Sequence, residues 1–338
     1  MLAADDSHIG QPSKVAIVTH LHPTIEAQLR EEAAADRPPI HALSIEAARE
    51  RLRSDAAAGN ATPPSVADVA AFDVDGPEGG ELTLRAYWPD ESDRFAQPGQ
   101  ALPVLCWYHG GGFALGDLQT TDPIARVLTS EIGCLVVTVD YRLAPEHPFP
   151  AGVEDCYATL EWVTEHAESI GGDPDRIAVG GGSAGGGLAA AVALLARDRG
   201  GPSIVRQSLV CPVTTDDQSL PARQQNASGY GLTADELAWY HEMYTPDAVS
   251  AANPYAYPLK ARSLAELPPA TVVTAGFDPL RDDGARFADR LDSAGVQTTY
   301  RCFESVTHSF FGMLVEPSIE PAWAAIETIE SDLSAGFE

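Results

Sequence analysis

The chain has 338 residues, of which 44% are hydrophobic and 21% charged, so it can bury a core without disulfides or a structural metal. Its formal net charge of −28 would repel nucleic acid and anionic membrane surfaces, which excludes both as partners. No run of 18 apolar residues occurs, so we expect no transmembrane helix. The acidic, lysine-poor composition fits either adaptation to a salty environment or a drift in genome composition.

The N-terminal segment and the cysteines indicate a cytoplasmic protein. Asp5 and Asp6 stand where a signal peptide would carry positive charge, and Val15–Val18 is too short for its apolar segment. The five cysteines are scattered and form no C-x-x-C pair: Cys106, Cys134, Cys156, Cys211 and Cys302. We therefore expect a reducing compartment, with neither a disulfide framework nor a zinc site.

Helices are expected first, and strands alternate with helices after them. Pro23–Ala35 has apolar residues at helical spacing, Ser44 is a candidate N-cap for a helix over Ile45–Ala58, and the prolines of Asn60–Ser65 mark a linker. The expected strands that follow are Val69–Val74, Glu81–Trp88, Pro103–Tyr108, Cys134–Val139, Arg176–Val179, Ile204–Cys211, Ala270–Thr274 and Thr298–Phe303. The expected helices among them include Gly152–Ala167, Ala184–Arg197, Gly284–Ala294 and Ile319–Leu333. This alternation predicts an α/β fold with a mostly parallel central sheet that helices cover on both faces.

The strand rhythm stops over residues 212–264, where aromatic residues and prolines are frequent. We interpret this segment as an insertion that lies over the sheet.

Ser183 lies in a glycine-rich turn between an expected strand and an expected helix. Gly181-x-Ser183-x-Gly185 is the pattern of a nucleophile elbow, in which a strained turn exposes the serine and the helix N-terminus points free amides at it. Two alternatives stay open. Gly180-x-Gly182-x-x-Gly185 also matches the dinucleotide fingerprint, although the ribose-binding acid about 20 residues further on is missing. A purely structural glycine turn is the other alternative.

A second glycine-rich segment, HGGGF over residues 109–113, follows the expected strand Pro103–Tyr108. Such a loop supplies backbone amides to the oxyanion that forms when a serine attacks a carbonyl, and glycine allows close approach to the substrate. A plain connecting turn is the alternative. We expect His109 to anchor the loop by hydrogen bonding. The candidate oxyanion donors are the amides of Gly111, Gly112 and Ala184, with Gly110 as a further candidate.

The acid of a catalytic triad is expected after the strand Ala270–Thr274, because active-site residues stand at the carboxyl ends of parallel strands. Asp278 occupies that position. Asp282 and Asp283 are alternatives, but they lie past the turn, where we expect them to cap the next helix.

The base follows from the order serine, acid, histidine that this strand arrangement uses. Only His241 and His308 follow Ser183, and His241 lies in the insertion, so His308 is the expected general base. His20-x-His22 has the spacing of a metal pair but lacks a third ligand, so we expect no metal there.

Five motifs together make the chain resemble the bacterial hormone-sensitive-lipase-like esterases, the family IV carboxylesterases of the α/β-hydrolase fold. They are the HGGGF loop, the segment Asp140–Ala151 (DYRLAPEHPFPA), the turn Gly181–Gly186 (GGSAGG), the segment Asp278–Asp282 (DPLRD) and His308. The resemblance covers nearly the whole chain. The residue before the serine, usually Asp or Thr in this family, is Gly182 here, and Ser309 follows His308 where glycine is common.

The resemblance implies a mainly helical cap of residues 1–60 and 212–264 over a catalytic domain of residues 61–211 and 265–338. It further implies small acyl esters as substrates, no cofactor and often a homodimer. We expect the acyl pocket near Phe113 and aromatic residues of the insertion, Tyr230, Trp239 and Tyr244.

Residues and resemblance together predict a serine carboxylesterase that cleaves short- to medium-chain acyl esters through an acyl-enzyme intermediate. An amidase or carbamate hydrolase and a long-chain lipase are alternatives of the same chemistry. A non-catalytic small-molecule receptor on the same fold is an alternative of another class. Such receptors usually lack the triad histidine, whereas all three triad residues are present in this chain.

Overall fold

The computed structural model describes residues 20–59, 62–97 and 99–338. One eight-stranded sheet runs through it in the order β1-β2-β4-β3-β5-β6-β7-β8. The strands are β1 (Asp68–Asp75), β2 (Glu81–Trp88), β3 (Leu102–Tyr108), β4 (Leu135–Val139), β5 (Gly172–Gly182), β6 (Arg206–Val210), β7 (Ala270–Phe277) and β8 (Thr298–Thr307). β2 pairs antiparallel with β1 and with β4, and the pairs from β4 to β8 are parallel.

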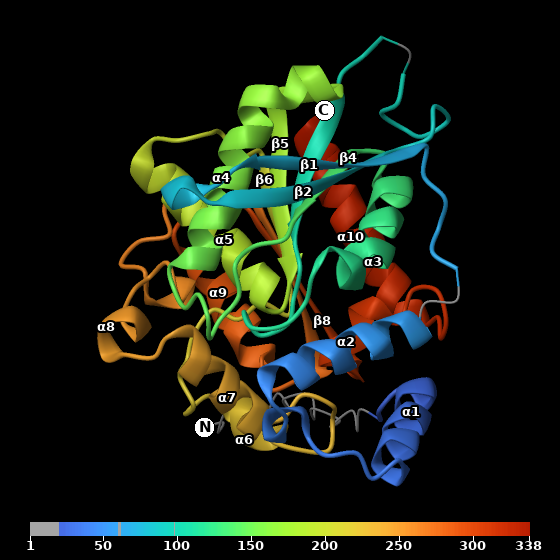
Figure 1. Ribbon diagram of the computed structural model, residues 1–338, viewed down its shortest axis with the longest axis vertical. Helices are drawn as coiled ribbons and strands as arrows, with labels where there is room; N and C mark the ends of the chain where they lie inside the picture. Colours follow the sequence, from blue (N-terminus) through green and yellow to red (C-terminus); the bar gives the residue numbers. More distant parts are fainter. Residues whose placement is uncertain (1–19, 60–61, 98) are drawn as a thin grey trace, which may run out of the picture.

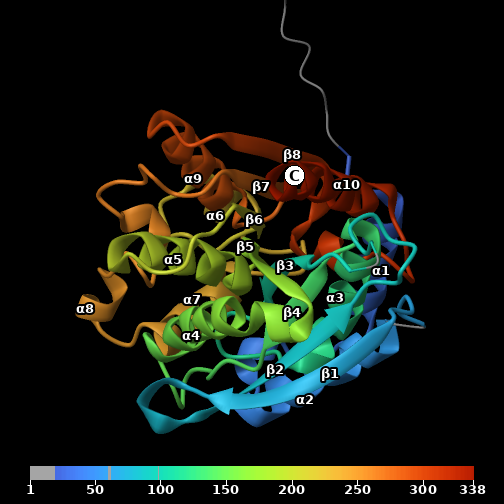
Figure 2. The same cartoon turned by 90° about the horizontal axis from the view of Figure 1, so that it is seen from above.

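Helices cover both faces of this sheet (Figure 2). Core contacts place α3 and α10 against one face and α4, α5 and α9 against the other. The α-helices are α1 (Pro23–Ala34), α2 (Ile45–Gly59), α3 (Leu118–Ile132), α4 (Ala151–His166), α5 (Ala184–Arg199), α6 (Pro221–Gln225), α7 (Ala234–Tyr244), α8 (Ala248–Ala251), α9 (Arg281–Ser293) and α10 (Glu320–Phe337). Short 3₁₀ turns are η1 (Ile40–Ala42), η2 (Pro77–Gly79), η3 (Ala167–Ile170), η4 (Pro258–Lys260) and η5 (His308–Gly312). The predicted α/β-hydrolase fold is confirmed.

β3 illustrates why an unbroken apolar run becomes a central strand. All its residues are buried, because helices cover the sheet on both sides. Val104, Cys106 and Tyr108 join the core on the α4 and α5 face. Leu105 and Trp107 join the core on the α3 and α10 face, where Trp107 stacks on Phe311 with ring centroids 5.9 Å apart. Alternate side chains therefore fill two cores, which fixes the register of the strand.

Segments that are far apart in the sequence gather at one end of the molecule. Figure 1 shows α1, α2, α6 and α7 at the lower end of the molecule, and η1 packs against α7. Ser44 caps α2 as predicted, since its Oγ accepts the amide of Ala47 at 3.3 Å. Residues 1–19 of the expected cap, including Asp5, Asp6 and Val15–Val18, lie outside the described residues.

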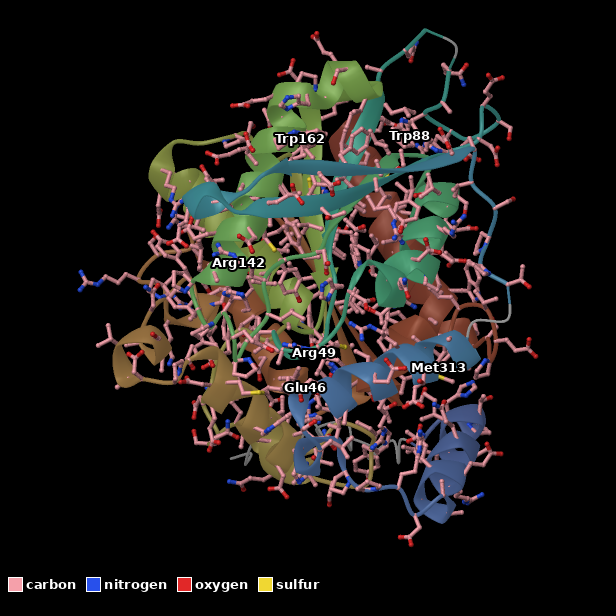
Figure 3. The ribbon with its side chains drawn as sticks, in the orientation of Figure 1. Glu46, Arg49, Trp88, Arg142, Trp162 and Met313 are labelled. Atoms are coloured by element: carbon pink, nitrogen blue, oxygen red, sulfur yellow. The ribbon has the colours of Figure 1, made fainter. Side chains whose placement is uncertain are left out.

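Arg49 ties α2 to the rest of the fold (Figure 3). Its guanidinium donates to the carbonyl oxygens of Ala114 at 2.9 Å and Ala144 at 3.0 Å, and it pairs with Glu146 at 2.7 Å. Ala114 directly follows the HGGGF loop, so one side chain joins the N-terminal helix to that loop.

Two element boundaries near the candidate site differ from the prediction. β7 continues to Phe277 instead of ending at Thr274, because Phe277 pairs with Thr307 of β8 beyond a register shift. α9 begins at Arg281 instead of Gly284. The Asp278 carboxylate accepts the amide of Leu280 at 2.8 Å, and the Asp278 carbonyl accepts the amide of Arg281 at 3.1 Å, so the chain turns into the helix at once.

No helix in the described part of the chain is long and apolar enough to cross a membrane. The five cysteines are unpaired, and four of them are buried: Cys106, Cys134, Cys156 and Cys211. Burial raises the pKa of each of these four thiols, to about 12 for Cys106. A protonated, inaccessible thiol is a poor nucleophile.

We therefore expect a thiol reagent such as 5,5′-dithiobis(2-nitrobenzoic acid) to titrate Cys302 alone in the native protein, because Cys302 is only half-buried. All five thiols should react after denaturation. Cys302→Ser is the control and should remove the fast-reacting group. Rapid reaction of further thiols in the native state would contradict the burial of the other four.

Candidate active site

Ser183 is the single residue between a strand and a helix. β5 ends at Gly182 and α5 begins at Ala184, and Ser183 between them has φ 58° and ψ −120°. A positive φ is strained for a residue with a Cβ, and such strain persists only where neighbours fix it. The Ser183 amide donates to the Val210 carbonyl at 2.8 Å, and its carbonyl accepts the Val213 amide at 3.1 Å. The backbone beyond β6 therefore holds the strained turn.

The two outer glycines of the turn are required by close packing. A Cβ on Gly185 would overlap the Tyr108 carbonyl, and one on Gly181 would overlap the carbonyl of Gly185. In contrast, a Cβ on Gly182 would meet no atom within 4 Å, and its φ is not positive. Close packing therefore requires glycine at positions 181 and 185 but not at position 182, where the sequence departs from the family pattern.

Three side chains from separate loops meet in one hydrogen-bonded line. His308 Nε2 lies 2.9 Å from Ser183 Oγ, and His308 Nδ1 lies 2.8 Å from Asp278 Oδ2. The network assigns the Nδ1 proton to the bond with the carboxylate, which leaves Nε2 to accept from the hydroxyl. Asp278 is fully buried at the end of β7, and His308 directly follows β8. The structure thus brings together the three residues singled out from the sequence.

The two alternative acids have other partners. Asp282 Oδ2 accepts the amide of Ala222 at 2.8 Å, and Asp283 pairs with the Arg223 guanidinium at 3.0 Å. Burial raises the pKa of Asp283 to about 7, against the lowering effect of Arg223. The expectation that both cap α9 is wrong, since they lie within its first turn and bind α6.

The HGGGF loop lies directly against the nucleophile turn. A Cβ on Gly110 would lie 3.0 Å from the Gly182 carbonyl oxygen and 3.4 Å from Ser183 Cβ. Gly111 and Gly112 have φ 118° and 61°, values that favour glycine. Among the described residues, the amides of Gly111, Gly112 and Ala184 have no hydrogen-bond acceptor within the protein. These free donors match the ones predicted for the oxyanion.

His109 anchors the HGGGF loop by a hydrogen bond and a ring contact. It is 4% exposed, its Nδ1 lies 2.8 Å from the Gly110 carbonyl oxygen, and its ring stacks on Tyr141 at 4.1 Å. The Tyr141 hydroxyl donates to the His109 carbonyl at 2.9 Å. Burial lowers the pKa of His109 to about 4, so it is neutral at pH 7.

The four predicted pocket residues differ in their ring contacts. Phe113 and Tyr244 are buried and stack with ring centroids 3.7 Å apart and planes 7° apart. Tyr230 instead contacts Phe277, the residue before Asp278, at 5.0 Å. Trp239 contacts Tyr240 at 5.1 Å.

Sequence reasoning missed Tyr240, whose ring covers the oxyanion loop: a Cβ on Gly112 would overlap that ring. Tyr240 lies in the aromatic-rich segment 212–264, but no local pattern separates it from its aromatic neighbours.

Sequence reasoning also missed Cys211, which follows β6. Its place at the end of a parallel strand is the signal that would have indicated a position next to the triad. Its sulfur, a carboxylate oxygen of Asp278 and a ring nitrogen of His308 lie within 4.8 Å of one another, the one such group of potential metal ligands in the described residues. Burial, followed by the charge of Asp278, raises the pKa of the Cys211 thiol well above its usual value. Because metal ligation needs a thiolate and the other two groups bind each other, we assign no metal here.

Comparison with known proteins adds to this geometry. Residues 105–312 match the model of a family described as having the alpha/beta hydrolase fold. An esterase of Mycobacterium tuberculosis, LipI, is 44% identical over 271 residues, which cover 79% of this chain and 82% of that protein. An ethyl acetate hydrolase of Pseudomonas putida is 33% identical over 301 residues, which cover 87% and 92% of the two chains. The solved structure of a hyperthermophilic esterase from Pyrobaculum calidifontis superposes with a TM-score of 0.86 at 36% identity, covering 94% of this chain and 98% of that one.

The contrast between the glycines gives a matched pair of variants. Gly185→Ala should force Tyr108 away from the turn and lower kcat at least about 100-fold, since displacements near 1 Å cost that much. Gly182→Ala should keep kcat within about threefold and stability within about 0.5 kcal/mol. Ester kinetics and urea unfolding check both. Equal effects of the two substitutions would contradict the packing described here.

The buried histidines predict how stability depends on pH. Burial lowers the pKa of His109 and of His241 to about 4, below the value of about 6.5 in an unfolded chain. As pH falls from about 6.5 to about 4, the unfolded chain therefore gains protons that the native state does not. The free energy of unfolding therefore decreases over this window, by up to about 1.4 kcal/mol per pH unit for each histidine.

His241→Asn should flatten this dependence, and urea unfolding at pH 7 and pH 5 measures it. His147→Asn, which removes an exposed histidine, is the control. An unchanged slope in His241→Asn would refute the prediction.

Proposed function

Because the chain belongs to the α/β-hydrolase family, and within it to the hormone-sensitive-lipase-like esterases, we propose that it hydrolyses short- to medium-chain carboxylic esters. The observation that carries the proposal is the hydrogen-bonded line from Ser183 through His308 to Asp278 beside free backbone amides. The esterase and ethyl acetate hydrolase relatives support a small ester as substrate.

In the proposed reaction Ser183 Oγ attacks the ester carbonyl while His308 Nε2 takes its proton. Asp278 keeps the Nδ1 proton in place and stabilises the imidazolium that forms. The imidazolium then gives its proton to the leaving alcohol, and an acyl-enzyme remains on Ser183. His308 next removes a proton from water as the water oxygen attacks the acyl carbon. The imidazolium then returns this proton to Ser183 Oγ as the bond from Ser183 to the acyl carbon breaks and the acid is released. Side chains and water supply every step, so we propose no cofactor.

The oxyanion is held by the amides of Gly111, Gly112 and Ala184, with Gly110 as a further candidate. They are free donors on a preorganised backbone, which makes them able to bind the charge as it develops. Each such donor stabilises the transition state by about 3 kcal/mol.

We propose that residues 1–60 and 212–264 form the cap and that the rest of the chain forms the catalytic domain. The position of α1, α2, α6 and α7 at one end of the molecule supports this division (Figure 1). Phe113, Tyr244, Tyr230 and Trp239 would then border the acyl pocket, and the aromatic cover over Gly112 would limit the space for long chains.

A cytoplasmic location and a homodimer are further proposals. Unpaired cysteines in the described chain are consistent with a reducing compartment. The dimer rests on the family resemblance alone, and analytical ultracentrifugation measures it.

The test uses a series of p-nitrophenyl esters of increasing acyl length, at low and at high salt. We expect activity to be greatest for short acyl chains and to fall at least about 10⁴-fold in Ser183→Ala. Ser203→Ala, which removes an exposed serine in the loop between α5 and β6, is the matched control and should keep wild-type rates. If salt adaptation explains the acidic surface, activity will also rise with salt, which screens repulsion between carboxylates.

Undiminished hydrolysis by Ser183→Ala would refute the assigned nucleophile. No turnover of any ester, with stoichiometric binding of small molecules, would favour the receptor alternative. Turnover of amides at a rate above that of the matched esters would favour the amidase alternative.

A further inference from the structure

Helix α6 lies against the segment that holds the proposed catalytic acid. α6 spans Pro221–Gln225 and belongs to the proposed cap, whereas Asp278 stands on the loop between β7 and α9. The two segments are about 50 residues apart in the sequence and in contact in the structure.

Asn226, the C-cap residue directly after α6, binds this loop at two points. Its Nδ2 donates to the carbonyl oxygen of Asp278 at 3.0 Å and to that of Gly276 at 3.2 Å. The side chain is 5% exposed, so both hydrogen bonds form away from bulk water, where a lost partner is costly. One amide group therefore spans the backbone on both sides of Phe277 and ends on the residue whose carboxylate binds His308.

Further contacts fix α6 in front of the loop. The amide of Ala222 donates to Asp282 Oδ2 at 2.8 Å, and the guanidinium of Arg281 donates to Gln225 Oε1 at 2.9 Å. Arg223 and Asp283 form an ion pair whose side chains are 1% and 0% exposed. The helix thus binds residues 281–283 with three of its residues, while Asn226 alone reaches the acid itself.

The loop that holds Asp278 follows an irregular end of β7. The pairing of β7 with β8 shifts register between Ala275 and Phe277, although Gly276 still packs closely against the backbone of Glu304 in β8. Arg281, the first residue of α9, also bonds these carbonyls: its amide reaches that of Asp278 at 3.1 Å, and its guanidinium reaches that of Gly276 at 3.4 Å. Asn226 adds hydrogen bonds to both carbonyls from outside the loop.

We propose that Asn226 is a positioning residue that sets the direction of the Asp278 carboxylate toward His308. The inference rests on the proposed function, in which Asp278 orients the base. It makes the insertion a part of the catalytic apparatus as well as a wall of the pocket. Loss of the two hydrogen bonds would let the acid loop shift and weaken the 2.8 Å contact that holds the Nδ1 proton.

The central variant is Asn226→Leu, which is close in shape and has no donor. We expect kcat to fall about 10- to 100-fold while KM changes less than about threefold, because substrate binding does not involve the acid. The downfield proton resonance of a histidine Nδ1–H bonded to a carboxylate should broaden or disappear. Gln225→Ala is the matched control, since it removes an exposed hydrogen bond from the same helix to the same loop. It should change kcat less than threefold and retain the resonance.

Asp278→Asn and urea unfolding complete the design. Asp278→Asn should lose activity if the proposed function is right. If a folded Asn226→Leu variant then shows a normal kcat and a normal resonance, the inference is overturned and the proposed function stays intact. Full activity in Asp278→Asn would overturn the proposed function itself. If Asn226→Leu fails to fold, Asn226→Ser replaces it: an intermediate kcat, with the resonance retained in part, supports the inference, and wild-type values overturn it.

Discussion

The strained backbone at Ser183 is the constraint on which the site depends. The turn is possible only because the backbones of the HGGGF loop, the start of α5 and the segment after β6 approach it more closely than side chains would allow. Glycine at positions 181 and 185 is therefore a packing requirement, whereas Gly182 is not. The same contacts bring the free amides beside the hydroxyl, so the geometry that strains the nucleophile also places the groups that stabilise its product.

Much of this was predictable because parallel strands bring their carboxyl ends to one edge of the sheet. That rule, with the chain order of serine, acid and histidine, led from short apolar runs to Ser183, Asp278 and His308, which the structure joins by hydrogen bonds. The amides of Gly111 and Gly112 were predictable too, since the glycine run ends a buried strand. These features are local in sequence, and each has a fixed position relative to a strand.

What could not be predicted depends on contacts between distant segments. Asp282 and Asp283 look like capping residues when only α9 is considered, and their pairing with α6 arises from the path of residues 212–226 over the sheet. Tyr240 of α7 likewise covers Gly112 from a segment that is remote in the sequence. Periodicity describes which face of an element is apolar, but it carries no information on which remote element will lie against it.

Arg49 has a consequence for how separable the parts of this protein are. It lies on α2, and it satisfies the carbonyl of Ala114 next to the HGGGF loop and that of Ala144 in the DYRLAPEHPFPA segment. A chain trimmed to the sheet and its flanking helices would leave both carbonyls without this donor, at the very loop that faces the nucleophile. Helix α2 is therefore a structural support of that loop, and an exchange of the helix between relatives would have to retain the arginine.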